Sequence, residues 1–495
     1  MLKVPVPGNT PATGSLAGYV VPSNFKGQVP AGVLKIDRNL PVKDGPPLNN
    51  FGPRFGFAWQ PLSKSLVIRG GIGLFYDRIG GNLFVHSVEQ GNPYAVTLDY
   101  AGPAAQPASL QQLFPAATLS FIPRWVDFTT GKTSNLNLPF IDETIHTPLV
   151  RQYNLGVQWE FMRGWVLDVG FVGSSGINLA DYNHNYNTAL LASPSNPING
   201  VTTNTVANAN LRVPYLGFAA SGFQGTGFDG ISNYDSLQVT ARKQLSHGVT
   251  FQAAYTWSKA LTDLIGYGAN GNDASSLSQQ YGPAYYNRPQ RFVVNYSWDL
   301  PFGHPSGFLG KLAEGWNASG VTVVQAGTPL TFTDARAGTI YGVSGPSPTT
   351  PTLNTVIFGA FNVGRAQLCN GATYGSLDTP GSVQDRLGGA SKGPGFFTTS
   401  SFCAPPAIGN GTGYGNSGVG IDLGPGQFNW DFSLVKTTRI TERQMLQFRT
   451  EFFNTFNHPQ FNNPGTADST PATFGVITSS SVNPRLIQFA LKYSF

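Results

Sequence analysis

Among the residues of this sequence that could do chemistry, Ser391 is a candidate nucleophile. It lies in Gly389-Ala390-Ser391-Lys392-Gly393, which fits the G-x-S-x-G nucleophile pattern. That pattern requires a strand before the serine and a helix after it, so that the hydroxyl stands on a sharp turn. Here QDRLG precedes the motif and Pro394-Gly395 follows it, within a long loop-like stretch. We therefore interpret the match as a coincidence in a glycine-rich chain.

Phosphate and metal sites are no better indicated. Gly131-Lys132-Thr133 resembles the end of a phosphate-binding loop, but Val126 stands where that loop needs its first glycine. The run 70–73 is glycine-rich but lacks a following helix whose amides could face a phosphate. Asp142 and Glu143 are adjacent, and neighbouring side chains on an extended chain point apart. The histidines share no metal-ligand spacing: His86, His146, His184, His247, His304 and His458. We expect no enzyme, no cofactor and no metal.

The two cysteines, Cys369 and Cys403, lie 34 positions apart in one loop-like region. Neither belongs to a C-x-x-C pair or has a nearby histidine, so we expect a single loop disulfide formed in an oxidising compartment. The formal net charge is only +5, and the 30 Lys and Arg residues are scattered. Nucleic-acid surfaces need clustered cations, so no nucleic-acid partner is expected.

Composition narrows the class of protein. Charged residues make up 11% of the 495 positions, less than half of the usual share of about 25%. The hydrophobic content of 40% excludes a chain disordered by its charge. No run of 18 apolar residues could form a transmembrane helix. A secreted β protein and an outer-membrane barrel both remain compatible with these values.

Alternation of apolar and small or polar residues predicts strands throughout. Phe55, Phe57 and Trp59 share one face, and a second alternating run starts at Leu66 after only five residues. Similar paired runs follow to the end of the chain, where Ile487 begins the last one. Period-2 alternation in paired runs indicates hairpins. We count about eleven strands of roughly ten residues, which is long enough to cross a bilayer at a tilt. The run 316–325 alternates poorly, and its faces stay unassigned.

Alternation alone does not separate a soluble sandwich, whose apolar face is a core, from a barrel, whose apolar face meets lipid. Connection lengths and tryptophans favour the barrel. Connections are short at 61–65, 162–164, 246–248, 301–314 and 439–443, and long at about 79–148, 179–231, 262–287, 328–427 and 457–484. Short turns at one end and long loops at the other are typical of outer-membrane barrels. Five tryptophans near short turns predict an interfacial aromatic belt: Trp59, Trp159, Trp165, Trp298 and Trp316.

Strand parity predicts that the chain does not close a barrel by itself. If the short turns are periplasmic, strands one and eleven run in the same direction, and an antiparallel barrel needs an even number. The start of the chain also lacks the charged and apolar regions of a signal peptide. We therefore expect residues 1–48, rich in Pro and Gly, to be an extracellular-loop segment. Residues 49–495 would form the C-terminal part of a larger barrel.

Several segments resemble the barrel of Oar-like TonB-dependent receptors. They are NNFGPRFGFAWQPLSKSLVIRGGIGLFYDR at 49–78, RQYNLGVQWEF at 151–161, YDSLQVTARKQLSHGVTFQAAYTWSKAL at 234–261, NRPQRFVVNYSWDLPFG at 287–303, ITERQMLQFRTEFFNTFNHPQFNNP at 440–464 and FGVITSSSVNPRLIQFALKYSF at 474–495. Together they cover nearly all of the expected strands in order. Tyr493 and Phe495, on the alternating last strand, are similar to the C-terminal insertion signal that the barrel assembly machinery reads.

The resemblance implies a 22-stranded antiparallel transmembrane β-barrel in the outer membrane, closed around a plug. Such a receptor binds an extracellular ligand and passes it to the periplasm with energy from TonB. The sequence departs from this pattern because it has no signal peptide, plug or TonB box and about half of the strands. The plug domain and the TonB complex would therefore be partners outside this chain, alongside outer-membrane lipid and an unidentified ligand. Charges on the polar face (Asp168, Arg449, Glu451, Lys492) would pair with one another or contact the plug.

Two other functions are weighed. The first is a structural or adhesive outer-membrane protein that binds through its loops without active transport, favoured by the long 328–427 loop. The second is a secreted β-sandwich glycosidase, which needs two carboxyl groups about 5–10 Å apart. No pair of Asp or Glu residues in the sequence is indicated for that role.

Overall fold

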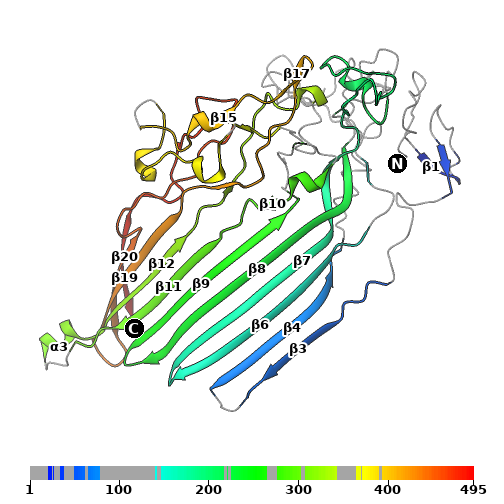
Figure 1. The fold of residues 1–495 in the computed structure, drawn as a ribbon. Helices are drawn as coiled ribbons and strands as arrows, with labels where there is room; N and C mark the ends of the chain where they lie inside the picture. The colour runs from blue at the N-terminus through cyan, green and yellow to red at the C-terminus, as the bar shows by residue number, and fades with distance from the viewer. Residues whose placement is uncertain are drawn as a thin grey trace, which may run out of the picture.

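One large antiparallel sheet dominates the structure (Figure 1). The computed structural model describes residues 20–24, 26, 34–37, 49–61, 65–78, 140–141, 146–216, 220, 224–264, 272, 276–302, 307–342, 364–369, 371–389 and 393–495. Its long strands, in sheet order, are β3 (Arg54–Trp59), β4 (Leu66–Tyr76), β6 (Leu149–Met162), β7 (Trp165–Asn185), β8 (Gln224–Ser246), β9 (Val249–Thr262), β11 (Gln290–Asp299), β12 (Trp316–Gln325), β19 (Gln427–Arg439), β20 (Met445–Phe453) and β21 (Leu486–Ser494). Each pairs antiparallel with the next, so the expected all-β meander of eleven strands is confirmed.

The remaining described elements are short. Strand β10 (Gly282–Pro283) extends β9, and β5 (Phe140–Ile141) pairs with β8. Separate two-stranded ladders join β1 (Val20–Pro22) to β2 (Leu34–Ile36), β13 (Pro329–Leu330) to β18 (Asp422–Leu423), β14 (Gln367–Leu368) to β15 (Phe402–Cys403), and β16 (Ala407–Ile408) to β17 (Gly411–Thr412). The helical turns are η3 (Ala209–Leu211), η4 (Leu277–Gln280), α3 (Phe308–Ala313), η5 (Thr339–Tyr341), η6 (Tyr374–Ser376), η7 (Val383–Asp385) and η8 (Thr399–Ser401). No helix within the described part of the chain is both long and apolar enough to span a membrane.

The sheet is open in the described residues. Strands β3 and β21 form its two edges, and neither pairs with the other. Because the eleven strands alternate in direction, β3 and β21 run the same way. An antiparallel ladder between these two edges is therefore excluded by their directions.

The register sorts the side chains onto an apolar and a polar face. Ile72 lies opposite Phe55 on one side and Tyr153 on the other, which makes a continuous apolar row. On the polar face Asp168 lies opposite Gln158 and Thr240. The alternation seen in the sequence thus survives pairing, because side chains directly opposite one another share a face.

Within the described ranges no second layer covers the apolar face. Phe55 is 68% exposed, Trp59 60% and Phe489 66%, although all three are large hydrophobic side chains. A soluble sandwich would bury this face against another sheet. A bare apolar face of this extent is instead the surface that a barrel presents to lipid.

Strands β7 and β8 are longer than the sequence pattern indicates. We expected a loop from about 179 to 231, whereas β7 continues to Asn185 and β8 already begins at Gln224. Their ladder shifts register three times beyond Gly176. These bulges interrupt the strict alternation on which strand prediction depends, which explains why the outer ends were assigned to a loop.

The two ends of the sheet differ as expected. The connections β3–β4, β6–β7, β8–β9 and β19–β20 are short, and the β11–β12 connection carries α3. The described parts of the long connections gather at the opposite end (Figure 1). Most of the fully buried hydrophobic side chains are found in these connections rather than in the sheet.

Candidate functional site

Most of the sequence motifs considered for catalysis fall where the structure gives no description. Ser391, Gly131-Lys132-Thr133, the Asp142-Glu143 pair, His86 and His304 lie outside the described residues. Within the described ranges, no group of three or more His, Cys, Asp or Glu side chains could hold a metal ion.

Two histidines have structural positions. His247 occupies the β8–β9 turn with φ of 51°, and the backbone N–H of His458 donates to Asn454 Oδ1 over 3.0 Å. The His458 ring packs edge-on against Phe428 with ring centroids 6.0 Å apart. Both positions are tied to turns of the chain.

The five tryptophans singled out in the sequence lie at the short-turn end of the sheet. They share its apolar face, and several contact other aromatic rings or a cation there. The centroid of Trp159 is 5.8 Å from that of Phe161, which lies 6.2 Å from that of Trp165. The Lys436 ammonium lies 5.6 Å from the centre of the Trp316 ring. Trp257 was not singled out, although it is 59% exposed on the same face nearer the other end of its strand.

The last strand carries the two residues expected to act as an insertion signal. Tyr493 pairs with Leu446 in the β20–β21 ladder, and its ring stacks on that of Phe495 with centroids 5.6 Å apart. Phe495 is 92% exposed. Both rings therefore lie at the sheet edge, available to another molecule.

Charges on the polar face pair within the sheet. Arg69 forms an ion pair with Asp168, and Arg449 Nη1 lies 3.5 Å from Glu451 Oε1. Gly156 lies opposite Arg69, and Gly170 lies opposite Gly156, so two residues without side chains flank the path from Arg69 to Asp168.

Cys369 and Cys403 form a disulfide between the ends of β14 and β15, with Cα atoms 5.1 Å apart. The Cys369 amide also donates to the Ser401 carbonyl over 2.9 Å. The disulfide therefore closes a ladder that the backbone already forms.

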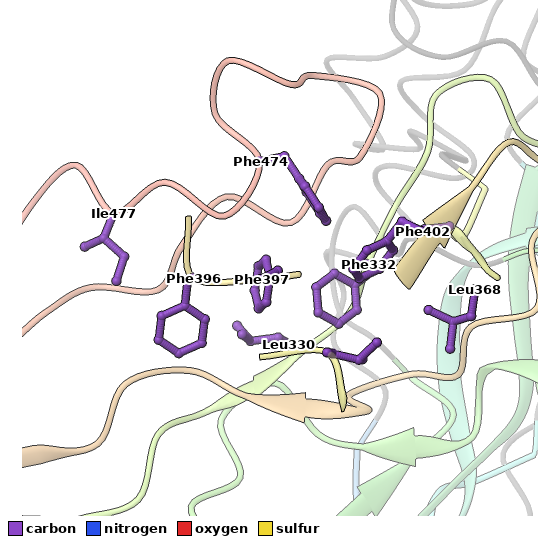
Figure 2. Close-up of a cluster of buried hydrophobic side chains, with 10 residues drawn as sticks. Leu330, Phe332, Leu368, Phe396, Phe397, Phe402, Phe474 and Ile477 are labelled. Atoms are coloured by element: carbon purple, nitrogen blue, oxygen red, sulfur yellow. The ribbon is translucent and has the colours of Figure 1, made fainter. Parts of the chain in front are cut away.

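Beside this disulfide the long connections build a hydrophobic core of their own, which we call the loop core (Figure 2). Phe332 is its centre: it is fully buried, and its ring centroid lies 4.7 Å from Phe397 and 4.9 Å from Phe402. Phe474 comes from the connection before β21 and packs 4.9 Å from Phe402. The buried members are Leu330, Phe332, Ala366, Leu368, Leu377, Phe396, Phe397, Phe402, Phe474 and Ile477. Two connections far apart in the sequence thus fold into one unit.

Ionic contacts join the same connections. The Asp334 carboxylate is fully buried and accepts hydrogen bonds from Arg336 Nε over 2.9 Å and Nη2 over 2.6 Å. Arg336 Nη2 also lies 2.9 Å from Asp468 Oδ2. The hydrogen bonds that Arg336 donates to Asp334 raise the pKa of Arg336 and hold its charge.

A carboxyl pair lies next to the loop core. Burial, with a contribution from the Asp378 charge, raises the pKa of Asp422 to about 7. Asp378 in turn lies 2.9 Å from Arg386 Nη1, and the Arg386 guanidinium stacks 4.0 Å above the Phe396 ring. Asp422 therefore keeps its proton until the pH approaches neutrality.

Between the loop core and the upper end of the sheet lies a cavity of about 370 Å³, which we call the rim cavity. Its volume is in the lower part of the range of small-molecule sites. It is lined by Arg288, Thr328, Pro425, Gln427, Phe461, Asn462 and Asn463. The cavity lies on the polar side of the sheet. Its wall residue Gln427 lies opposite Gln325, and Gln325 lies opposite Arg291, so these three polar side chains share one face.

Hydrogen bonds fix the polar walls of the rim cavity. Asn463 Nδ2 donates to Thr328 Oγ1 over 2.9 Å, and Asn462 Nδ2 donates to Ser479 Oγ over 2.8 Å. Gln427 Nε2 donates to Ser481 Oγ over 2.9 Å. These three amides are thus oriented by their neighbours in the two connections.

The rim cavity and the loop core share a residue. Phe461 lines the cavity and also packs against the loop core. Its neighbours in sequence, Asn462 and Asn463, follow directly from that anchor. The folding of the long connections therefore sets the geometry of the cavity.

Arg288 is the cation of the rim cavity. Its Nη1 donates to the Ala326 carbonyl over 2.6 Å. Burial, and then the charge of Arg291, lowers the pKa of Arg288. Sequence reasoning missed this site, although NRPQR carries two arginines with no acidic residue between Asp273 and Asp299. That local excess of positive charge is the signal that could have found it.

Comparisons with known proteins give a family. A model of the family described as outer membrane beta barrel domain matches residues 12–488. No curated protein is similar enough in sequence to count as a match.

Solved structures with similarity to the chain include the outer membrane transporter YddB from Escherichia coli. The identity is 9% and the TM-score 0.43, over 90% of this chain and 40% of that one. The FrpB iron transporter from Neisseria meningitidis gives 9% identity and a TM-score of 0.37, over 90% and 39%. The ferric preacinetobactin receptor BauA from Acinetobacter baumannii gives 9% and 0.36, over 90% and 36%. The chain thus spans at most 40% of the length of each of these proteins.

Proposed function

We propose that this chain forms barrel strands of an Oar-like TonB-dependent receptor. The chain belongs to the outer membrane beta barrel domain family and is located in the outer membrane. In this function the long loops capture an extracellular ligand. A plug domain, rearranged by TonB, then lets the ligand pass to the periplasm. The plug and the TonB complex are partners outside this chain.

The observation that carries the proposal is the bare apolar face of the sheet combined with its polar opposite face. Large apolar side chains such as Phe55 and Phe489 are exposed on one side, whereas Asp168 and Gln158 lie on the other. Lipid outside and a polar lumen inside satisfy both faces at once. The expected aromatic belt at the short-turn end fits a periplasmic membrane interface.

The open sheet supports a larger barrel. In lipid, unpaired backbone groups at an edge are costly, so β3 and β21 need strand partners. Because these edges run in the same direction, antiparallel closure requires an odd number of further strands. Eleven more would complete the 22 strands that the sequence resemblance implies. We accordingly propose that residues 49–495 supply the C-terminal part of the barrel and residues 1–48 an extracellular segment.

The loop core and rim cavity support ligand capture. A folded, disulfide-linked unit above the polar face holds a cavity with fixed polar walls. Ligands bind most tightly to sites that are already ordered. In the proposed receptor this cavity lies at the entrance to the lumen.

The test is to isolate from outer membranes the polypeptide that carries this chain and to sequence it by mass spectrometry. We expect a product much larger than 52.8 kDa, or a co-purifying partner, with peptides from a plug and a TonB box. A 52.8 kDa product that closes a barrel without either would contradict the proposal. Recovery in the soluble fraction would contradict the barrel itself.

A structural or adhesive role without transport is the second candidate. The loop core favours it, because ten buried residues and a disulfide make a rigid surface that need not move for binding. Cells lacking TonB discriminate the two functions. Adhesion would persist in such cells, whereas uptake through a TonB-dependent receptor would stop.

A further inference from the structure

We propose that the rim cavity binds the oxyanion group of a small extracellular ligand, a carboxylate or a phosphate, through Arg288, with Arg291 as a second positive charge close to Arg288. This inference rests on the proposed function, since it names the ligand class of the same receptor. The cavity offers a volume of about 370 Å³, which is large enough for a small organic molecule rather than a bare ion.

The first step is the imbalance of charge at the cavity. A guanidinium has five N–H donors, and within the described residues the Arg288 guanidinium donates one hydrogen bond, to the backbone carbonyl of Ala326. Neither Arg288 nor Arg291 forms an ion pair with any carboxylate in the described ranges. Burial first, and then repulsion by the Arg291 charge, lowers the pKa of Arg288. An anion bound at Arg288 would offset that repulsion.

The second step is the set of donors around the charges. Asn462 Nδ2 donates two hydrogen bonds, to Ser479 Oγ and to the Ser480 carbonyl, whereas Asn463 Nδ2 donates one, to Thr328 Oγ1. Each side-chain amide has two N–H bonds, so Asn463 retains one for a ligand. Donors held in place before binding lose little freedom when the ligand arrives.

The third step is the exclusion of other ligand classes. A cation would be repelled by both guanidinium groups. A neutral polyol would cover Arg288 without compensating its charge, and a buried charge without a partner is unfavourable. Phe461 and Pro425 add an apolar wall that suits the carbon part of an organic anion.

The test uses the outer-membrane polypeptide that carries this chain, purified in detergent, with three probes in calorimetry: succinate, inorganic phosphate and the neutral sugar maltose. We expect binding of succinate or phosphate that weakens with added salt, and no binding of maltose. Arg288→Gln should weaken the binding about tenfold or more, as loss of charged hydrogen bonds does. The matched control is Arg485→Gln, an exposed arginine at the same end whose recorded bonds go to Asn457 and Thr455. It should change the affinity less than about twofold.

The outcomes decide the proposal. A preference for succinate identifies a carboxylate ligand, and a preference for phosphate identifies a phosphate ligand. Equal binding of maltose, an unchanged affinity in Arg288→Gln, or no binding of any probe would overturn it. If Arg288→Gln does not fold, Asn463→Ala tests the same cavity, because it removes an amide donor from the wall and should also weaken binding. Binding requires neither plug movement nor TonB, so the two proposals can fail separately. If the anion binds but no TonB-dependent uptake is found, only the receptor function is refuted. If uptake is found but no anion binds, only the ligand class is refuted.

Discussion

Truncating Phe332 to alanine should open the loop core while leaving the sheet intact. The ring is fully buried, with Phe397, Phe402 and Phe474 at centroid distances of 4.7, 4.9 and 6.3 Å. Such a truncation removes the transfer free energy of the ring and leaves a cavity, at a cost of about 3–5 kcal/mol. Collapse of the site is limited, because the β14–β15 ladder and its disulfide hold the walls apart. Since about 1.4 kcal/mol is a factor of ten, local opening should become about a hundredfold to a few thousandfold more frequent.

Hydrogen exchange of individual amides measures this change. The Ala366 amide donates to the Phe332 carbonyl over 3.0 Å, and the Thr398 amide donates to the Leu377 carbonyl over 2.7 Å. Both amides should exchange faster in Phe332→Ala by that factor, while amides of β9 keep their rates. Leu423→Ala, at an exposed position beside the core, is the control and should change little. Unchanged exchange at Ala366 and Thr398 would refute the view that Phe332 organises the loops.

Three further changes test other parts of the structure. Cys369→Ser removes a cross-link between residues 34 positions apart, which should lower the stability of the loops by about 4 kcal/mol because the unfolded chain gains entropy. Faster cleavage of the loops by a protease measures this loss. The raised pKa of Asp422, about 7 against 3.8, means that the folded loops keep a proton that the unfolded chain loses. Loop stability should therefore fall as pH rises from about 4 to about 7, and Asp422→Asn should abolish that fall in a pH series of the same cleavage assay. Gly173→Ala places a Cβ into the ring of Tyr153, which should destabilise the folded sheet by about 1–3 kcal/mol and lower the yield of refolding in detergent. Gly375→Ala, which has open space around it, is the control and should leave the yield unchanged.

Most of the sheet could be predicted from the sequence, because successive side chains of a strand between lipid and a wet lumen face the lipid and the lumen in turn. The exception is β12. Its apolar face carries Ala318 and Gly320, while Val321 and Val323 point to the polar side. The reason is Tyr296, whose ring lies over Gly320 and whose hydroxyl accepts a hydrogen bond from Trp430 Nε1 over 3.2 Å. A neighbouring strand supplies the apolar surface there, and single-strand periodicity does not contain that information.

The loop core and the rim cavity could not be predicted in the same way. Their residues come from connections without periodicity, such as Phe332 and Phe474, which meet only after the chain has folded. The pairing of Cys369 with Cys403 was expected only because the chain has no other cysteine. Binding residues on loops are positioned by packing between distant segments, and a single sequence does not record which segments meet.

The stability of the loops and the affinity of the rim cavity should be linked through Phe461. This side chain packs on the loop core and also lines the cavity, so opening the core withdraws one wall together with Asn462 and Asn463. A ligand that binds only the closed form then stabilises it by RT ln(1 + [L]/Kd). By the same linkage, Phe332→Ala should weaken binding once the open form becomes the major state, although Phe332 does not line the cavity. The disulfide and the ion pair between the buried Asp334 and Arg336 therefore act on binding as well as on folding, since they keep the cavity assembled before the ligand arrives.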